Sequence, residues 1–157
     1  MAEPVHASLF LSWCHQDARA KETLLGLLHL DVLAGVCISW WEDSHQLLGV
    51  DWRRRILAQL DGCDYGLLLL SPGFFGSRFI LEEELPRLLG RDVDKVLPVM
   101  LKRVPMDGSR DLHGVDTRQI FRGSGGRGFT ETQGPGRERF ALDFATKIRE
   151  RVLSDAA

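Results

Sequence analysis

The sequence predicts an α/β fold of the flavodoxin-like class, in which helices cover both faces of a central, mostly parallel sheet of four or five strands. The first observation is an alternation, between residues 5 and 105, of short apolar segments with segments whose apolar residues recur at helical spacing. The second is that the connections between them are short, which favours parallel strands joined by right-handed crossovers. The third is the length of 157 residues, which suits one domain. We therefore expect residues 1–157 to form a single domain with its core in residues 5–105.

Four segments are predicted as strands, because each is short, apolar and rich in residues that favour sheets. The third ends in four consecutive leucines followed by Ser71 and Pro72, which is typical of a buried parallel strand. The fourth contains Pro98, which has no N–H to donate to a ladder, so this strand is expected at an edge or at a bulge. The predicted ranges are 7–13, 36–41, 65–70 and 95–101.

Four segments are predicted as helices, from start and stop signals and from their apolar faces. Asp17 is expected to cap the first helix, whose leucines continue towards Gly35. The second helix places Trp52, Ile56 and Leu60 four residues apart, and therefore on one face. The last helix carries apolar residues at the same spacing, namely Phe140, Phe144, Ile148 and Val152. The predicted ranges are about 18–35, 51–62, 81–90 and 137–153.

The stretch between the last strand and the last helix, residues 102–136, is predicted to be irregular. Its glycine-rich part, residues 123–136, superficially looks like a phosphate-binding loop. Such loops follow a strand directly and open a helix, whereas no strand precedes this segment. We interpret residues 123–136 as a mobile surface loop.

Composition excludes several classes of function. The net charge of −2 provides no electrostatic reason to expect a nucleic acid polymer or an anionic membrane as partner. No apolar run approaches the roughly 18 residues that a membrane span needs, and the N-terminus does not have the pattern of a signal peptide. The three cysteines, Cys14, Cys37 and Cys63, have no metal-binding spacing, so no metal site is expected. We interpret them as buried thiols of a cytoplasmic protein.

Residues 67–89 indicate where chemistry is to be sought. A buried strand ends at Ser71-Pro72, a loop with glycines and phenylalanines follows, and Glu82, Glu83 and Glu84 open the next helix. In open α/β sheets, ligands bind beside the carboxyl ends of the strands, which is where these carboxylates are expected. Acidic residues are also favoured in a first helical turn by the helix dipole, by about 0.3–1 kcal/mol each, so their presence alone does not require a function.

Four segments, taken together, carry a family resemblance. They are LFLSWCHQD (9–17), WWEDSHQLLGVDW (40–52), LLLLSPGFFGSRFILEEELPRLL (67–89) and KVLPVML (95–101). In their order and spacing over residues 5–105 they resemble the signatures of the TIR (Toll/interleukin-1 receptor-like) domain. The Glu-Leu-Pro at the end of the third segment is similar to bacterial TIR domains rather than to animal receptor adaptors.

The resemblance implies a function. Many bacterial TIR domains cleave NAD⁺ to nicotinamide and a linear or cyclic ADP-ribose product, as effectors of antiviral defence. NAD⁺ would then be the substrate, and no cofactor is expected. The resemblance further implies activation by self-association, with residues 42–49 as the contact loop and Leu47 and Leu48 exposed on it, under the control of an upstream sensor module or signal.

Two of the glutamates are candidates for the catalytic carboxylate. In the family this residue lies six or seven positions after a serine of the third segment, and counting from Ser77 leads to Glu83 or Glu84. At about 100° per residue, Glu83 points away from the apolar helix face, whereas Glu84 lies beside it, where a side chain can line a cleft. Glu84 is therefore predicted, with Glu83 second. This prediction assumes that the helix begins near Glu82 or Glu83, because Pro86 has to lie in the first turn.

Five further residues are predicted to bind substrate, and each has a structural alternative. Trp13 and Cys14 follow the first strand at the same edge, as does His15, which we interpret as solvated rather than as a base. Trp52 is expected to stack on a flat ring or, equally, to pack in the core. Asp43 would bind a ribose hydroxyl or only initiate its loop. Ser77 completes the set, while turn chemistry accounts for the serine at position 71.

Two alternatives to catalysis remain open at this stage. A non-catalytic TIR adaptor would use the same fold only to recruit another TIR domain, and it would not require Glu84. A flavodoxin-like nucleotide binder or phosphoacceptor would need an acidic cluster after the first strand, where only Asp17 is found.

Overall fold

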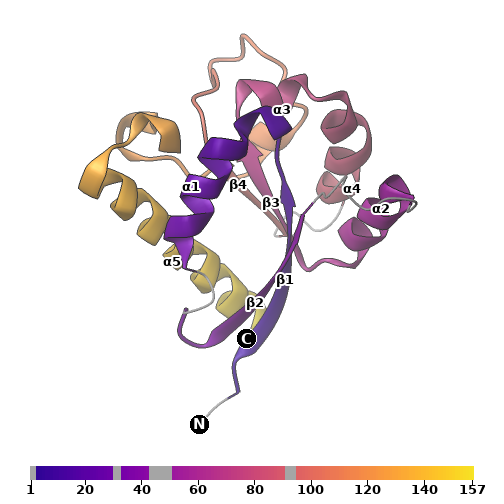
Figure 1. Cartoon of the computed structure of the whole chain (residues 1–157), viewed down its shortest axis with the longest axis vertical. Helices are drawn as coiled ribbons and strands as arrows, with labels where there is room; N and C mark the ends of the chain where they lie inside the picture. The colour runs from indigo at the N-terminus through magenta and orange to yellow at the C-terminus, as the bar shows by residue number, and fades with distance from the viewer. Residues whose placement is uncertain (1–2, 30–32, 43–50, 91–94) are drawn as a thin grey trace.

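The computed structural model describes residues 3–29, 33–42, 51–90 and 95–157. Four parallel strands form one sheet in the order β2-β1-β3-β4 (Figure 1). This is the flavodoxin-like order, in which β1 and β3 occupy the centre and β2 and β4 the edges. The strands are β1 (Val5–Ser12), β2 (Val36–Glu42), β3 (Tyr65–Leu70) and β4 (Val96–Met100).

Helices cover both faces of the sheet, which confirms the predicted fold class. The helices α1 (Ala18–Leu28) and α5 (Gly134–Ala156) pack on one face. The other face carries α2 (Trp52–Gly62), α3 (Pro72–Gly76), the π-helical turn η3 (Ile80–Glu84) and α4 (Leu85–Leu89). In Figure 1, α1 and α5 lie on one side of the strands and α2 and α4 on the other. Short 3-10 turns are η1 (His15–Asp17), η5 (Val115–Thr117), η6 (Ser124–Gly126) and η7 (Phe129–Glu131).

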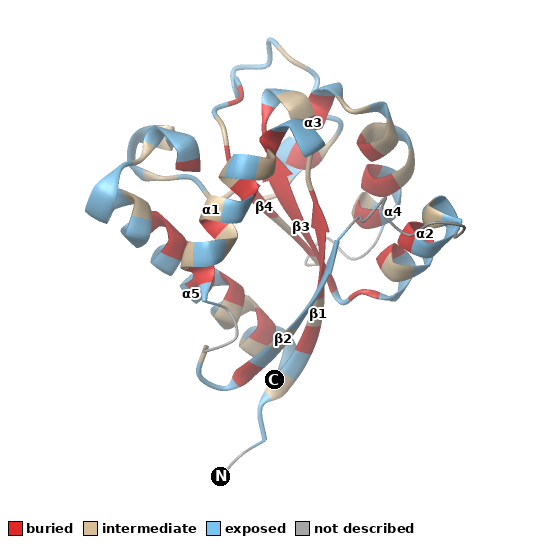
Figure 2. Cartoon of the chain, in the orientation of Figure 1, coloured by how far each residue is buried: buried red, intermediate tan, exposed pale blue. Residues whose placement is uncertain are grey.

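Two apolar clusters follow from the alternation of side chains along the strands. In β1, Leu9 and Leu11 pack against α1 and α5, whereas Phe10 packs against α2, α3 and α4. All six residues of β3 are buried, as expected for a central parallel strand, and Figure 2 shows burial concentrated along β3 and β4 and on the facing sides of the helices. No helix in the described part of the chain is long and apolar enough to cross a bilayer.

The prediction that Pro98 lies in an edge strand is confirmed. On the outer side of β4, the backbone of Phe121 forms an isolated bridge: its N–H donates to the carbonyl of Pro98 and its carbonyl accepts from the N–H of Met100, each at 2.9 Å. Residues 98 and 100 therefore direct their backbone groups outwards. The missing N–H of Pro98 thus faces away from β3 and breaks no bond within the sheet.

Several element boundaries differ from the prediction. The first helix ends at Leu28, where His29 adopts a left-handed conformation (φ 48°), and does not continue to Gly35. The last helix runs from Gly134 to Ala156 and is longer than predicted. Residues 72–76, expected as a loop, form α3, because the hydroxyl of Ser71 accepts the Phe74 N–H at 3.0 Å and caps the turn.

The glycine-rich segment is more closely packed than a surface loop. Residues 102–136 are irregular, as predicted, apart from the 3-10 turns and the start of α5. However, Phe129 is 1% exposed and joins the core beside α5, and the N–H of Thr130 donates to the carbonyl of Leu101 at 3.0 Å. Gly128 runs so close to the backbone after β4 that a Cβ would lie 3.0 Å from it. The interpretation of residues 123–136 as a surface loop is wrong at these positions.

The cysteines also differ in part from the prediction. All three are free thiols, but only Cys63 is buried, whereas Cys14 is half-buried and Cys37 is exposed on the edge strand β2.

The amino end of β3 is tied to the end of α5. The hydroxyl of Tyr65 donates to Asp155 at 2.7 Å, and Arg151 and Lys95 lie 3.4 and 3.6 Å from the same carboxylate. Desolvation by burial acts to raise the pKa of Asp155, but the bond from Tyr65 and the two cations outweigh it and lower that pKa.

Candidate functional site

A cavity of about 680 Å³ opens at the carboxyl edge of the sheet. The chain leaves β1 towards β2 and leaves β3 towards β4, so the connections diverge and a crevice remains between them. Its volume is in the range of small-molecule sites, roughly 300–1,000 Å³. The lining residues come from the segments after β1 and β3, from the start of α2 and from η3: Trp13, Cys14, His15, Gln16, Trp52, Pro72, Gly73, Gly76, Ser77, Phe79, Ile80 and Glu84.

Among the described residues that line this cavity, Glu84 is the one with a carboxylate. The residue is only 2% exposed, and its Oε2 accepts a hydrogen bond of 3.0 Å from the hydroxyl of Ser12, the last residue of β1. A carboxylate held in this way, with little water around it, exerts its charge more strongly than an exposed one.

The three consecutive glutamates have separate environments. Glu82 is exposed and forms a loose pair with Arg78 at 3.4 Å. Glu83, the second candidate, is bound by Arg53 of α2. Of the three, Glu84 alone is buried. The structure thus directs into the cavity the glutamate that the sequence favoured, while the catalytic role itself stays a prediction.

The local backbone differs from the one on which that choice depended. The helical segment begins at Arg78 and runs into η3 at Ile80, so it starts before Glu82 and Glu83. The N–H of Leu85 donates to the carbonyl of Ile80 in the wide π-helical pattern. Pro86 does lie in the first turn of α4. Proline has no N–H to donate to the carbonyl four residues earlier, and its ring clashes with that carbonyl. A wide π-helical turn directly before Pro86 is consistent with this constraint. A spacing of 100° per residue therefore does not apply to residues 80–84, and Glu84 is not at a helix N-terminus.

Four other predicted site residues line the same cavity. Trp13, Cys14, Trp52 and Ser77 come from three separate parts of the chain and meet there, together with His15. Asp43, like Leu47 and Leu48 of the predicted contact loop, lies outside the described residues.

The two tryptophans are held by different neighbours. The ring of Trp13 has the ammonium group of Lys21 at 4.2 Å from its centroid and the ring of His15 at 4.9 Å. Trp52 is half-buried with its ring 5.2 Å from that of Phe79. It packs against the apolar cluster and lines the cavity, so the two predicted roles of Trp52 are compatible.

The comparison with protein families agrees with this geometry. The family model described as the TIR domain matches residues 9–130, which contain every residue of the cavity.

The chain belongs to the TIR domain family.

A search of curated proteins finds none that matches this TIR domain. The predicted resemblance is therefore confirmed at the level of the family. TIR domains include proteins that cleave NAD⁺ and proteins that act as adaptors, so membership alone does not select between these functions.

Sequence reasoning missed a polar cluster at the carboxyl ends of the strands of the TIR domain. Asp17 does not cap α1 through its side chain, as was expected. Its carboxylate, 4% exposed, accepts hydrogen bonds from the hydroxyl of Ser71 and from the ammonium group of Lys102, the latter at 2.8 Å. These residues follow β1, β3 and β4, so the cluster joins the carboxyl ends of three strands. Nothing in the local sequence signals the pairing, because its members are far apart along the chain.

Sequence reasoning also missed Ser12. It is fully buried at the end of β1, and its hydroxyl is the partner of Glu84. The available signal was a serine within an apolar strand, since a buried hydroxyl requires a hydrogen-bonding partner.

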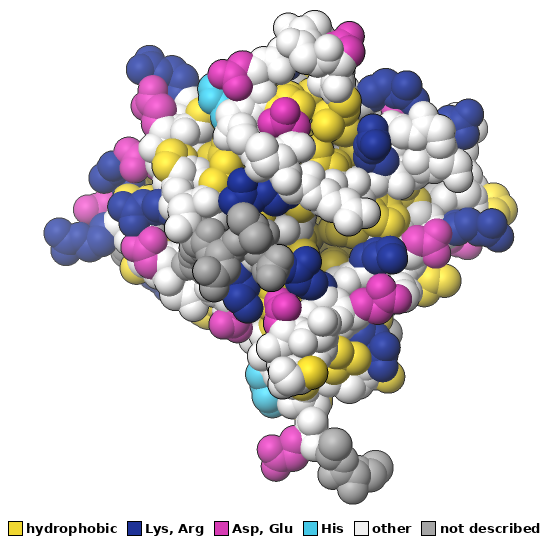
Figure 3. All heavy atoms as spheres, turned by 180° about the vertical axis from the view of Figure 1, so that it is seen from behind, with side chains coloured by type: hydrophobic (Ala, Val, Ile, Leu, Met, Phe, Trp, Pro, Cys, Tyr) yellow, Lys and Arg dark blue, Asp and Glu magenta, His cyan; other side chains and the backbone are white. Residues whose placement is uncertain are grey.

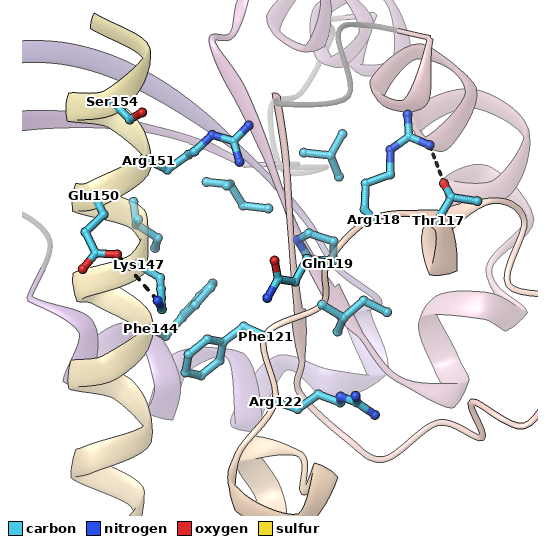
Figure 4. A pocket seen from close by; sticks show the side chains of 15 residues that line it. Thr117, Arg118, Gln119, Phe121, Arg122, Phe144, Lys147, Glu150, Arg151 and Ser154 are labelled. Atoms are coloured by element: carbon cyan, nitrogen blue, oxygen red, sulfur yellow. Dashed lines mark hydrogen bonds and ion pairs between the residues drawn. The ribbon is translucent and has the colours of Figure 1, made fainter. Parts of the chain in front are cut away.

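A second cavity, of about 670 Å³, lies between the edge strand β4, residues 117–122 and α5 (Figure 4). Arg151 extends from α5 towards the segment that carries Gln119, with Lys147 beside Glu150 at 3.6 Å. This cavity contains none of the predicted site residues. Three of the cations that line it have partners within the TIR domain, namely Arg118, Lys147 and Arg151, so the cavity with Glu84 is the better candidate site.

Charge is mixed on the face of the molecule that Figure 3 shows. On the face in Figure 3, cationic and anionic side chains are interspersed without a field of one sign, in line with the net charge of −2. Among the described residues, no group of three or more histidine, cysteine and acidic side chains is arranged to hold a metal ion.

Proposed function

We propose that this TIR domain cleaves NAD⁺ into nicotinamide and an ADP-ribose product, linear or cyclic, with Glu84 as the catalytic carboxylate. The observation that supports this most strongly is the position of Glu84, which is buried, hydrogen-bonded to Ser12 and part of the lining of a cavity of suitable size.

A single carboxylate is sufficient for this chemistry. Most glycosidases need a general acid, because their leaving group departs as a poor anion while the sugar acquires oxocarbenium character. In NAD⁺ the nicotinamide is already cationic and leaves as a neutral molecule, so no proton has to be supplied. The remaining requirement is a negative group near the anomeric carbon that stabilises the developing positive charge. Glu84 would provide it, and no role as a base is needed for His15.

The other residues of the cavity fit the binding of a dinucleotide. Trp13 and Trp52 provide flat rings on which adenine or nicotinamide would stack, and the hydroxyl of Ser77 and the thiol of Cys14 provide polar contacts. The hydroxyl of Ser77 also lies 3.4 Å from the N–H of Ile80, at the start of η3. A ligand bound by Ser77 would therefore contact the turn that carries Glu84.

The proposal includes a biological setting. The Glu-Leu-Pro sequence resembles bacterial TIR domains, which supports a role as an antiviral effector in the cytoplasm that is activated by self-association. The activating signal would come from a sensor module or partner protein.

The test is nicotinamide release from NAD⁺, measured by chromatography with the chain held at high local density on vesicles. Glu84→Gln keeps an acceptor for Ser12 but removes the charge, so it should lower the rate at least ~100-fold. Glu82→Gln is the matched control, because Glu82 is exposed on the same helical segment, and it should retain the wild-type rate. An active Glu84→Gln variant would refute the assignment. A folded, clustered wild-type chain that releases no nicotinamide would favour the adaptor function.

A further inference from the structure

Ser12 occupies an unusual position for a hydroxyl group. It is the last residue of β1, a strand in the centre of the sheet, and it is fully buried beside Leu68 of β3. Its side chain lies on the same face as Phe10, which is the face that carries η3 and α4. Burying a hydroxyl without a hydrogen bond is costly, whereas an apolar residue would fit this environment at no such cost. The presence of serine here therefore requires an explanation.

The partner of Ser12 provides that explanation. Its Oγ lies 3.0 Å from Oε2 of Glu84, a residue 72 positions later in the chain that is itself 2% exposed. An ionised carboxylate can only accept hydrogen bonds, so the hydroxyl is the donor. Because the bond is charge-assisted and shielded from water, it is stronger than an ordinary surface hydrogen bond.

The bond has a geometric consequence. Oε2 is held against the carboxyl end of β1, and the rest of the Glu84 side chain belongs to a π-helical turn. The rigid strand therefore determines how the carboxylate is oriented relative to the cavity that Glu84 lines. Without the hydroxyl, this hydrogen bond would be lost and the orientation of the carboxylate would be less restricted.

We infer that Ser12 is a positioning residue for Glu84: its hydroxyl holds the carboxylate in the correct orientation, and it acts on the reaction only through Glu84. This inference rests on the proposed NAD⁺ cleavage. It predicts an effect on turnover and not on substrate affinity, because Ser12 is not among the residues that line the cavity.

The test compares variants of the full chain, clustered on vesicles, by nicotinamide release over a range of NAD⁺ concentrations. Ser12→Ala should lower kcat by about 10- to 100-fold, the usual effect of losing a hydrogen bond to a charged group, while KM changes less than about two-fold. Ser12→Thr keeps the hydroxyl and should restore most of the rate. If its added methyl group prevents folding, Ser12→Cys, with a similar volume and a weak donor, should give an intermediate rate.

Two controls separate positioning from general damage. Ser8→Ala removes a hydroxyl of the same strand that is bonded to Asp64 at 3.2 Å and does not line the cavity, so it should leave kcat unchanged. The double variant Ser12→Ala/Glu84→Gln should be no slower than Glu84→Gln alone, because the catalytic charge that Ser12 would position is already absent.

The outcomes distinguish this inference from the proposed function. Full activity of Ser12→Ala, or a further additive loss in the double variant, would overturn the positioning role while NAD⁺ cleavage stands. A clustered wild-type chain that releases no nicotinamide would overturn the proposed function and this inference with it.

Discussion

Asp17→Asn is predicted to reduce the free energy of unfolding by about 2–3 kcal/mol, although the substitution changes the side-chain volume very little. The carboxylate of Asp17 is 4% exposed and accepts from the ammonium group of Lys102 at 2.8 Å and from the hydroxyl of Ser71. Asparagine can accept only through its one carbonyl oxygen. Its amide group would then face a donor, and one of the two charge-assisted bonds would be lost.

The magnitude follows from the unequal burial of the two ions. A fully exposed ion pair contributes about 0–1 kcal/mol, and breaking a fully buried one costs about 3–5 kcal/mol. Here the carboxylate is buried, but the side chain of Lys102 is 40% exposed and can turn into water when its partner is neutral. The expected loss therefore lies between these limits. Lys102→Met should cost at least as much, because the charge that it leaves unpaired is the buried one.

Urea denaturation of each variant, followed by circular dichroism, measures these losses, which correspond to a lowering of Tm by about 5–10 °C for Asp17→Asn. Asp61→Asn is the matched control, since Asp61 pairs with Arg87 at 2.7 Å on the surface, and it should cost less than about 1 kcal/mol. The double variant Asp17→Asn/Lys102→Met should lose at least ~1 kcal/mol less than the sum of the single variants. Strictly additive losses, or an Asp17→Asn variant as stable as the wild type, would refute this explanation of the cluster.

Two further predictions concern the central strand β3. Gly66→Ala should destabilise the chain by about 1–2 kcal/mol in urea denaturation, because the new methyl group would lie 2.5 Å from a Leu88 methyl in a fully buried site. This overpacking outweighs the stabilisation that comes from a stiffer unfolded chain. A variant as stable as the wild type would contradict this prediction. Tyr65→Phe should destabilise the folded chain at pH 7 and progressively less in acid, because it removes the bond to Asp155, whose pKa is lowered on folding. The stabilisation by ionised Asp155 is complete above its ordinary pKa of 3.8 and is lost as the pH falls through its pKa in the folded state. Unfolding free energies of both chains at pH 7 and at about pH 2.5 check it, and a difference that does not shrink in acid would contradict it.

The fold could be predicted because its signals are local. The leucine run of β3 and the apolar faces of α2 and α5 each appear within a few residues of sequence, and Pro98 limits β4 to an edge. Boundaries were predicted less well, since tertiary packing determines them. Phe129 shows this, because its burial against α5 organises a segment whose glycines alone suggest a loop.

The candidate site was predicted in part. Trp13, Trp52 and Glu84 meet in one cavity because they flank the carboxyl edge of a parallel sheet, which follows from the order of the elements. The preference for Glu84 came from an ideal helical spacing that the π-helical turn before Pro86 does not have. Its burial is therefore not a consequence of that spacing.

The sequence alone determined the class of fold, the family and the edge of the sheet at which a ligand would bind, because all three depend on patterns within short segments. Only the tertiary structure decided which side chains form ion pairs or hydrogen bonds with one another. The bond between Ser12 and Glu84 spans 72 positions, and Asp17 meets Lys102 across three strands. Such pairs form because the sheet brings distant strand ends together, and burial then requires each polar group to have a partner.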